Sequence, residues 1–456
     1  MKIKLTFAVF IIFASYLTAQ NNVLEKYIQE GLQSNLALKQ KQSSYEKSLQ
    51  VLKEAKGMFF PNLSFNARYS LADGGRIIEF PIADLLHPAY NTLNSLTSSN
   101  NFDELISKTK NETIPFLRPT EQETKLRLVQ PLFNPKIYYN SKIKSELTNA
   151  VKSDVGSFKR QLVAEIKSAY FNYLKTVHLL ELANKTTELL KENIRVNERL
   201  FANDKITIDN VYRSKAELSK LEQNIAEAIR YNKSAKAYFN FLLNKPLESD
   251  IEISDEIKLA PIEKDLQNSQ ENAINNREEL FKIKSYAKAN DYSLQLNKSN
   301  KAPNLIAVVD YGFQGEKYNF TSDDDFIMAS FVLSWDLFKG FQNKAKIQQA
   351  TIDKQIIETG YDEAENRVKL QVLDLYYEVE AVEKAITAAQ QEKLSAVKSF
   401  EIINKKYKEG QANLIQFIDA RTTMTNAEYN VIITTYDYKI KYAEFESAAC
   451  LYKLKE

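Results

Sequence analysis

Apolar and polar residues alternate along short segments of the chain, and the pattern predicts four β-strands, three of them with a clear apolar face. The segments cover residues 62–71, 125–133, 305–313 and 326–338. The apolar face of the first strand consists of Leu63, Phe65, Ala67, Tyr69 and Leu71. That of the third consists of Leu305, Ala307, Val309, Tyr311 and Phe313. That of the fourth consists of Ile327, Ala329, Phe331, Leu333 and Trp335.

Between the strands, apolar residues recur at helical spacing, and two of the predicted helices are very long. The first apolar seam has 4-3 spacing, as in a coiled coil, and consists of Leu162, Ile166, Ala169, Tyr173, Thr176, Leu180 and Ala183. The second begins 206 residues later (368 − 162) and consists of Val368, Val372, Leu375, Val379, Val382, Ile386 and Ala389. A helix of roughly 65 residues is about 100 Å long.

The chain repeats its plan. Pro61-Asn62-Leu63 recurs as Pro303-Asn304-Leu305, 242 residues later (303 − 61). Residues 128–133 (LVQPLF) recur as residues 333–338 (LSWDLF), 205 residues later (333 − 128). Each half therefore predicts a helix, two strands and a long helical hairpin, and a long loop at 72–122 accounts for the change in offset.

This repeat gives the predicted domain boundaries. We expect a first repeat over residues 20–245, a mixed equatorial segment over 246–270, a second repeat over 271–445 and a C-terminal tail over 446–456. The helices that precede the strands are predicted at 22–58 and 271–298, and the two hairpins at 136–243 and 340–445.

Residues 1–19 have the layout of a secretory signal peptide. Lys2 and Lys4 precede an apolar run from Leu5 to Leu17, and Thr18-Ala19 provides small residues for cleavage after Ala19. The alternative is a buried N-terminal helix. No later stretch has about 18 consecutive apolar residues, so the sequence predicts no transmembrane helix.

Composition excludes several classes of function. The chain has 61 Lys and Arg against 59 Asp and Glu, so it lacks the basic excess typical of nucleic-acid binding. Its single cysteine, Cys450, permits no intramolecular disulfide. His87 and His178 are the only histidines and lie at no metal-ligand spacing. We find no motif that indicates an enzyme, a metal or a cofactor, and we interpret Glu278-Glu279 as a polar helix face.

The predicted strands are long enough to cross a bilayer at a tilt. Four strands cannot close into a membrane barrel, and an open sheet edge in lipid leaves backbone groups unsatisfied. Several chains must therefore share one barrel, and three chains would give twelve strands, an even number. Charged residues such as Glu192, Arg195 and Glu198 exclude the long helices from lipid, so we expect them in an aqueous compartment.

With these features the chain resembles the TolC-like outer-membrane efflux family over its whole predicted mature length. The resemblance rests on the doubled Pro-Asn-Leu strand openings and on four further segments in the same order. These are Asn276 to Leu280 (NREEL), Leu333 to Gly340, Tyr407-Lys408-Glu409-Gly410, and Leu414 to Arg421 followed by Ala427.

The resemblance implies a mostly α fold with membrane β-strands. It implies a homotrimer in which four strands per chain build a twelve-stranded barrel in outer-membrane lipid. A long α-helical coiled-coil tunnel would continue this barrel into the periplasm of a bacterial cell. The partners it implies are a periplasmic adaptor (membrane fusion) protein and an inner-membrane transporter.

The function that the resemblance implies is the exit duct of a tripartite efflux system. The duct would passively conduct substrates that the inner-membrane pump expels. Two alternatives remain: the outer-membrane component of type I protein secretion, and, from another class, a periplasmic coiled-coil scaffold or adaptor that needs no lipid-facing strands.

The resemblance also places a periplasmic entrance at the turns of the two hairpins. The family's tyrosine and glycine at the second turn match Tyr407 and Gly410. Family members often carry two inward-facing acids just after this turn, and the matching positions hold Gln416 and Asp419. Residues around Gly410 are expected to dock the adaptor. An arginine that some members carry is replaced by Ala412.

In the first hairpin, Asp204 occupies the place usually held by glycine, and Asp209 and Asn210 follow. Three copies of Asp419 in a narrow mouth would favour cations. The alternative is that Asp209 and Asp419 are solvated residues at helix starts. Tyr69, Tyr311 and Trp335 are expected at the membrane interface, or else buried against a neighbouring strand.

Overall fold

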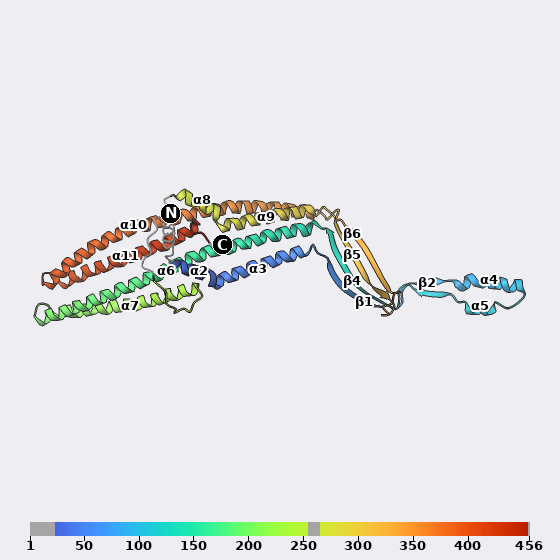
Figure 1. Cartoon of the computed structure of the whole chain (residues 1–456), viewed down its shortest axis with the longest axis horizontal. Helices are drawn as coiled ribbons and strands as arrows, with labels where there is room; N and C mark the ends of the chain where they lie inside the picture. The colour runs from blue at the N-terminus through green and yellow to red at the C-terminus, as the bar shows by residue number, and fades with distance from the viewer. Residues whose placement is uncertain (1–22, 254–264, 455–456) are drawn as a thin grey trace, which may run out of the picture. The chain divides into compact units, whose positions relative to one another are not determined.

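The computed structural model describes residues 23–253 and 265–454 (Figure 1). The predicted signal peptide lies outside these residues. The described chain forms two compact units. The helical unit contains residues up to 51, 144–291 and from 351 on; the sheet unit contains residues 52–143 and 292–350.

The helices have the following bounds. They are α2 (Val23–Ser34), α3 (Leu36–Gly57), α4 (Ile82–Thr97), α5 (Asp103–Lys108), α6 (Pro135–Ala202), α7 (Ile208–Leu242), α8 (Leu266–Asn276), α9 (Glu278–Ser299), α10 (Gln342–Lys408) and α11 (Leu414–Ala448). No helix in the described ranges combines the length and the apolarity needed to cross a membrane.

Two helical hairpins, α6 with α7 and α10 with α11, dominate the helical unit. The predicted seams are largely buried: Leu162 is 1% exposed, Ile166 0% and Val372 0%. Around the first seam, aromatic rings from α2, α6 and α7 pack together, with the rings of Tyr27 and Phe239 5.0 Å apart. The outer faces of the helices are polar, so the hairpins are stabilised by burying their apolar seams away from water.

Both predictions of an unbroken helix before the strands are wrong at one residue each. Asn35 separates α2 from α3, and Arg277 separates α8 from α9, 242 residues later (277 − 35). Asn35 accepts a hydrogen bond from the backbone N–H of Leu38, and its amide donates to the carbonyl oxygen of Leu242 in α7. The break is therefore part of the repeat, and the sequence conceals it because its partners lie far along the chain.

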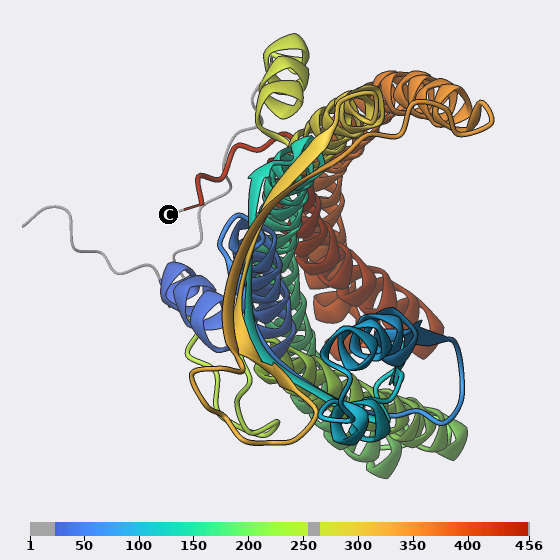
Figure 2. The ribbon, with the colours of Figure 1, turned by 90° about the vertical axis from the view of Figure 1, so that its right-hand side faces the viewer.

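The main sheet has four antiparallel strands in the order β1-β4-β5-β6. Their bounds are β1 (Asn62–Leu71), β4 (Thr120–Phe133), β5 (Asn304–Gly315) and β6 (Asp325–Ser334). The strands run side by side and curve along their length (Figures 1 and 2). The fourth strand ends at Ser334, before the predicted 338.

The predicted loop at 72–122 is wrong, because this segment is an ordered extension of the sheet. It contains β2 (Ile77–Phe80), α4, α5 and β3 (Glu112–Pro115), with β2 and β3 paired in a separate two-stranded sheet. β4 also begins at Thr120, earlier than predicted. Charged residues such as Glu121 and Glu123 occupy its polar face, and they concealed the strand in the sequence pattern.

The equatorial segment contains no strand in its described part. Residues 250–253, where a short strand would fit the pattern, are irregular, although Ile251 is buried among the aromatic residues of the first core. The segment also contributes the start of α8. α11 extends to Ala448, so the second hairpin is slightly longer than the predicted 340–445.

Candidate functional site

The two hairpins end in turns of the same construction. Each long helix closes with a backbone hydrogen bond that spans five residues, from Lys205 N–H to Leu200 O at 2.9 Å and from Gln411 N–H to Lys406 O at 2.8 Å. The residue before each donor is left-handed: Asp204 has φ +52° and Gly410 has φ +75°. This is the Schellman end of a helix, which favours glycine at the left-handed position.

The second hairpin restarts with a reciprocal cap. The side chain of Asn413 accepts a hydrogen bond from the backbone N–H of Gln416 at 2.9 Å, and the side chain of Gln416 accepts one from the N–H of Asn413 at 3.0 Å. Such a capping box satisfies two N–H groups at the start of α11. The side chain of Gln416 is therefore engaged at the helix terminus.

Tyr407 joins the two hairpins near these turns. Its hydroxyl donates a hydrogen bond to Asn197 Oδ1 in α6, and its ring stacks on Phe417 with 4.9 Å between centroids. Tyr407 is 3% exposed, and burial raises the pKa of its phenol. The group therefore stays neutral and contributes a hydrogen bond without charge.

Asn197 belongs to a buried polar cluster. Its amide donates to Ser214 Oγ in α7 at 2.6 Å, and Ser214 Oγ donates to Asn193 Oδ1 at 3.1 Å. Asn197 is 0% exposed and Ser214 is 1% exposed. Buried polar groups need partners, so Tyr407 completes a network that extends over three helices.

A second polar contact joins α7 and α11. Arg421 is 6% exposed, and its guanidinium donates to Glu217 Oε2 at 2.7 Å. Removing one partner of such a pair leaves a largely buried charge, which is costly. Together, the Tyr407 and Arg421 contacts hold one hairpin against the other within a single chain.

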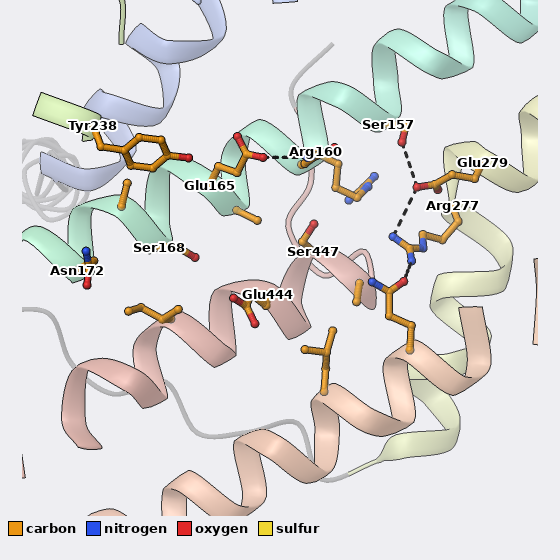
Figure 3. A pocket seen from close by; sticks show the side chains of 17 residues that line it. Ser157, Arg160, Glu165, Ser168, Asn172, Tyr238, Arg277, Glu279, Glu444 and Ser447 are labelled. Atoms are coloured by element: carbon orange, nitrogen blue, oxygen red, sulfur yellow. Dashed lines mark hydrogen bonds and ion pairs between the residues drawn. The ribbon is translucent and has the colours of Figure 1, made fainter. Parts of the chain in front are cut away.

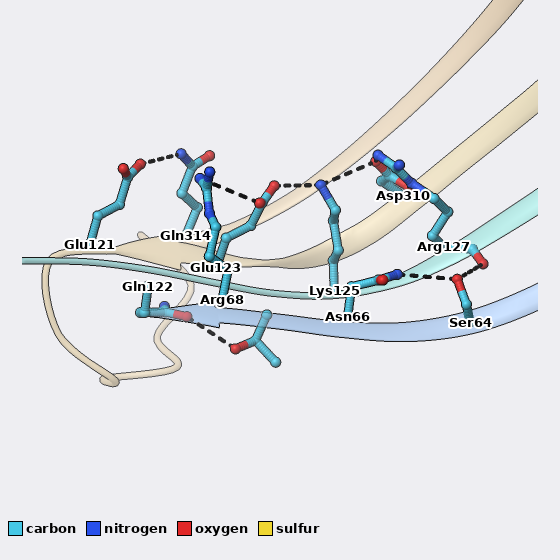
Figure 4. A network of polar contacts seen from close by, with 11 residues as sticks. Ser64, Asn66, Arg68, Glu121, Gln122, Glu123, Lys125, Arg127, Asp310 and Gln314 are labelled. Atoms are coloured by element: carbon cyan, nitrogen blue, oxygen red, sulfur yellow. Dashed lines mark hydrogen bonds and ion pairs between the residues drawn. The ribbon is translucent and has the colours of Figure 1, made fainter. Parts of the chain in front are cut away.

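The four-stranded sheet has one polar and one apolar face, in accordance with the predicted alternation. On the polar face, Asp310 accepts hydrogen bonds from Arg127 Nε at 2.8 Å and from Arg127 Nη2 at 2.7 Å (Figure 4). Lys125 lies between the carboxylates of Glu123 and Asp310, 2.5 and 3.6 Å away. The polar residues of this face therefore form a continuous ladder across β4 and β5.

The opposite face carries exposed apolar side chains. The exposed fraction is 68% for Phe65, 75% for Ile327 and 75% for Phe331. The strand register places these residues on the same face of the sheet as Leu126, Leu128 and Val309. An exposed apolar sheet face of this extent marks an interaction surface.

Solved structures of bacterial membrane proteins share this architecture over nearly the whole chain. The alignment covers 94% of this chain and 93% of a membrane protein from Pseudomonas aeruginosa, with a TM-score of 0.77 and 14% identity. It covers 93% of this chain and 95% of VceC from Vibrio cholerae, with a TM-score of 0.75 and 14% identity. The alignment with the outer membrane channel CmeC of Campylobacter jejuni covers 94% of this chain and 85% of that chain, with a TM-score of 0.76 and 13% identity.

The sequence supports the same assignment in the second repeat. Residues 270–449 match the outer membrane efflux protein family. The resemblance to TolC-like outer-membrane efflux proteins is confirmed. The mostly helical TolC-like fold predicted from the sequence is likewise confirmed. No curated protein matches the chain by sequence.

In this TolC-like chain, the predicted entrance residues gather at the hairpin turns but differ in environment. Asp204, Asp209 and Asp419 are exposed. Asp209 lies in the first turn of α7, where its carboxylate accepts a hydrogen bond from Thr207 Oγ1. Asn210 is half-buried, and its carbonyl oxygen lies 3.0 Å from Ser214 Oγ.

The predicted interface aromatics are all exposed. Tyr69 lies on the apolar face of β1 and is 52% exposed, and its ring stacks on Tyr318 at 5.7 Å. Tyr311 lies on the same face in β5 and is 48% exposed. Trp335 was predicted within the fourth strand, but it follows Ser334, the last residue of β6. Its indole N–H donates to Lys301 O at 2.9 Å.

A cavity of about 680 Å³ lies among α6, α9, α10 and α11 in the helical unit (Figure 3). Arg277 and Glu279 line it, and Ser157 donates to Glu279 Oε1 at 3.0 Å. Arg160 also lines the cavity and forms two hydrogen bonds to Glu278, at 2.9 and 2.7 Å. Glu278 is therefore the ion-pair partner of Arg160, and its neighbour Glu279 is exposed.

The sequence did not identify the Asn193–Asn197–Ser214 cluster or the Arg421–Glu217 pair. Asn193 and Asn197 are four residues apart in α6 and lie in a stretch with charged neighbours such as Arg195 and Glu198. Nothing in the local pattern separates these inward-facing amides from the solvent-exposed residues. A weak signal was available, because Tyr407 stands 206 residues after Phe201 and differs from it by one hydroxyl.

Proposed function

We propose that this protein is the outer-membrane exit duct of a tripartite efflux system. The observation that carries the proposal is a sheet with an exposed apolar face and a charged polar face, joined through continuous helices to long hairpins. The TolC-like fold and the outer membrane efflux family match in the second repeat support it. A passive duct needs no catalytic group or cofactor, because the inner-membrane pump supplies the energy.

The proposal includes a homotrimer with a shared twelve-stranded barrel. In the described sheet, β1 and β6 are the edge strands. Unpaired edges are not tolerated in lipid, so β6 of one chain must pair with β1 of the next. Three chains close the wall with an even number of strands. The apolar face would contact outer-membrane lipid, and the Arg127–Asp310 ladder would line the water-filled interior.

We further propose that the hairpin turns form the periplasmic entrance and meet the adaptor. Tyr407 would hold the two hairpins of each chain together, while Asp419 and Asp209 present carboxylates near the mouth. Gly410, Asp204, Asn210 and Gln416 shape the turns. Tyr69, Tyr311 and Trp335 would lie at the membrane boundary, where amphipathic rings are favoured.

The proposal also covers the cellular location of the protein and the organisation of its chain. Residues 1–19 would be removed on export, which leaves a mature chain of two repeats joined by the equatorial segment. Outer-membrane insertion would place the hairpins in the periplasm, where the adaptor and the inner-membrane transporter are reached.

The test is to purify the protein from outer-membrane fractions and to measure its stoichiometry and conductance. We expect detergent-requiring, heat-modifiable trimers that conduct ions across planar lipid bilayers. A protein that stays monomeric and soluble without detergent, and shows no conductance, would contradict the proposal and favour a periplasmic scaffold.

Cargo is tested separately in a deletion strain. Increased accumulation of dyes and antibiotics is the outcome expected for small-molecule efflux. Normal accumulation together with loss of a secreted protein would instead assign the duct to type I secretion.

A further inference from the structure

The extension between β1 and β4 carries a helix with three distinct faces. One face of α4, formed by Ala83, His87, Tyr90 and Asn94, packs on α5 and the residues that flank it. The ring of Tyr90 stacks on Phe102 at 6.1 Å, and Asn94 Nδ2 donates to Asp103 Oδ1 at 2.9 Å. His87 Nε2 lies 3.1 Å from Thr109 O. This face is therefore covered by the same chain.

A second face of α4 is apolar and exposed. Its residues follow 4-3-4-3 spacing: Ile82, Leu86, Ala89, Leu93 and Leu96. We call these five residues the α4 seam. Leu96 is 78% exposed, and the neighbouring Leu85 is 72% exposed. The third face is polar and contains Asp84, Asn91 and Ser95. Spacing of this kind is the pattern by which one helix packs against another.

The segment that carries the seam joins the end of β1 to the start of β4, whereas the long helices join the other ends of the strands. β1 begins after α3 and ends at Leu71, and β4 begins at Thr120 and leads into α6. The extension therefore leaves the sheet at the far ends of both strands (Figure 1). In the proposed duct this is the cell-surface mouth.

The charged residues of α4 indicate which kind of partner covers the seam. Helices that lie on anionic membrane surfaces are rich in Lys and Arg on their polar face. α4 contains no lysine or arginine, and Asp84 is its only acidic residue. A phosphate-rich lipid surface is thus a poor partner, whereas a second helix with the same apolar seam matches it.

We propose that the α4 seams of three copies of this chain pack on one another and form a helical cap at the surface mouth. This inference rests on the proposed trimer. Three extensions tethered to one barrel have a mutual effective concentration on the order of millimolar. Burial of the seam then stabilises the cluster, because it removes apolar leucine side chains from water.

The test uses cysteine cross-linking in outer-membrane fractions. Ala89→Cys lies in the seam, and Asn91→Cys on the polar face of the same helix is the matched control. Cys450 is buried, and the unsubstituted protein controls for it. We expect oxidation to yield several times more covalent dimer with Ala89→Cys than with Asn91→Cys. Adding Leu86→Glu and Leu93→Glu should abolish the Ala89→Cys dimer while trimers persist.

Stoichiometry, measured independently on the unsubstituted protein, separates the two proposals. Equal dimer yields at Ala89→Cys and Asn91→Cys in proven trimers would overturn the cap and leave the duct intact. Capture of a different surface protein by Ala89→Cys would overturn the choice of occupant. Absence of trimers in the unsubstituted protein would overturn the assembly on which the cap depends.

Discussion

Asp204 and Gly410 occupy the same left-handed position in two turns of the same construction. A side chain with a Cβ atom is strained there, and glycine is not. Asp partly offsets the strain, since its short polar side chain tolerates this conformation. The two turns therefore differ in conformational strain although their backbone hydrogen bonds correspond.

This difference gives a prediction for the turns. Asp204→Gly should stabilise the protein and Gly410→Ala should destabilise it, each by about 1 kcal/mol. The measurement is the thermal unfolding midpoint of the purified protein, followed by circular dichroism. Gly57→Ala, in α3 where no heavy atom lies within 4 Å of the added Cβ, is the control for the glycine substitution. A Gly410→Ala midpoint equal to or above that of the unsubstituted protein would contradict the strain argument.

At the scale of elements, one carboxylate of α6 holds two other helices. Asp154 Oδ2 lies 2.7 Å from Lys41 Nζ in α3, and Asp154 Oδ1 lies 2.9 Å from Lys282 Nζ in α9. The hydrogen bonds from Lys282 and Lys41 lower the pKa of Asp154 below its ordinary 3.8. The same residue thus links the helix before the strands in both repeats to the first long hairpin.

The sign of its pH dependence follows from the lowered pKa. Asp154 contributes stability above pH 3.8, the ordinary value, and this contribution is lost as the pH falls through the lower pKa of the folded state. Asp154→Asn should therefore lower the unfolding midpoint at neutral pH, and the difference from the unsubstituted protein should shrink in acid. The measurement is a series of thermal unfolding curves across this range.

Asp362→Asn is the matched control for this series. Asp362 is exposed on α10 and has no ion pair in the described part of the chain. Its substitution should leave the midpoint unchanged at every pH. A difference between Asp154→Asn and the unsubstituted protein that stays constant with pH would argue against the ion-pair account.

For the whole molecule, the contacts between the two hairpins would control the opening of the proposed entrance. Tyr407 contributes a hydrogen bond to Asn197 and a stacked ring. Tyr407→Phe removes the hydrogen bond and keeps the ring. A buried hydrogen bond contributes about 1 kcal/mol, so loosening it should raise the fraction of open channels several-fold.

Single-channel recording in planar bilayers measures this effect. Tyr377→Phe is the control, because Tyr377 is an exposed tyrosine on the same helix, α10. Unchanged conductance and open fraction with Tyr407→Phe, in folded trimers, would remove Tyr407 from the gate.

Asp419 makes a separate prediction about selectivity. Three symmetry copies of an exposed carboxylate at a narrow mouth would focus negative potential and attract cations. Asp419→Asn should weaken cation selectivity and block by trivalent cations. Reversal potentials in a salt gradient measure this. Asp209→Asn is the comparison, because Thr207 already engages the carboxylate of Asp209. Unchanged selectivity would make Asp419 a solvated helix residue only.

The sequence by itself determined the faces of the strands and the seams of the long helices. The cause is local: a period of two places Leu63 and Phe65 on one face, and 4-3 spacing places Leu162 and Ile166 on another. The Pro-Asn-Leu segment, which occurs twice, revealed the internal repeat. These features can be predicted from one sequence, because each depends only on residues that are close together along the chain.

Only the tertiary structure decided where helices break, which polar groups are buried, and that residues 72–119 fold. Asn35 breaks a helix because its amide binds Leu242 O, 207 residues away along the chain. Tyr407 is buried against Asn197, 210 residues away, and α4 is ordered by its contacts with α5. Local periodicity carries no record of such partners, so the chemistry of the candidate entrance emerges only when the two hairpins meet.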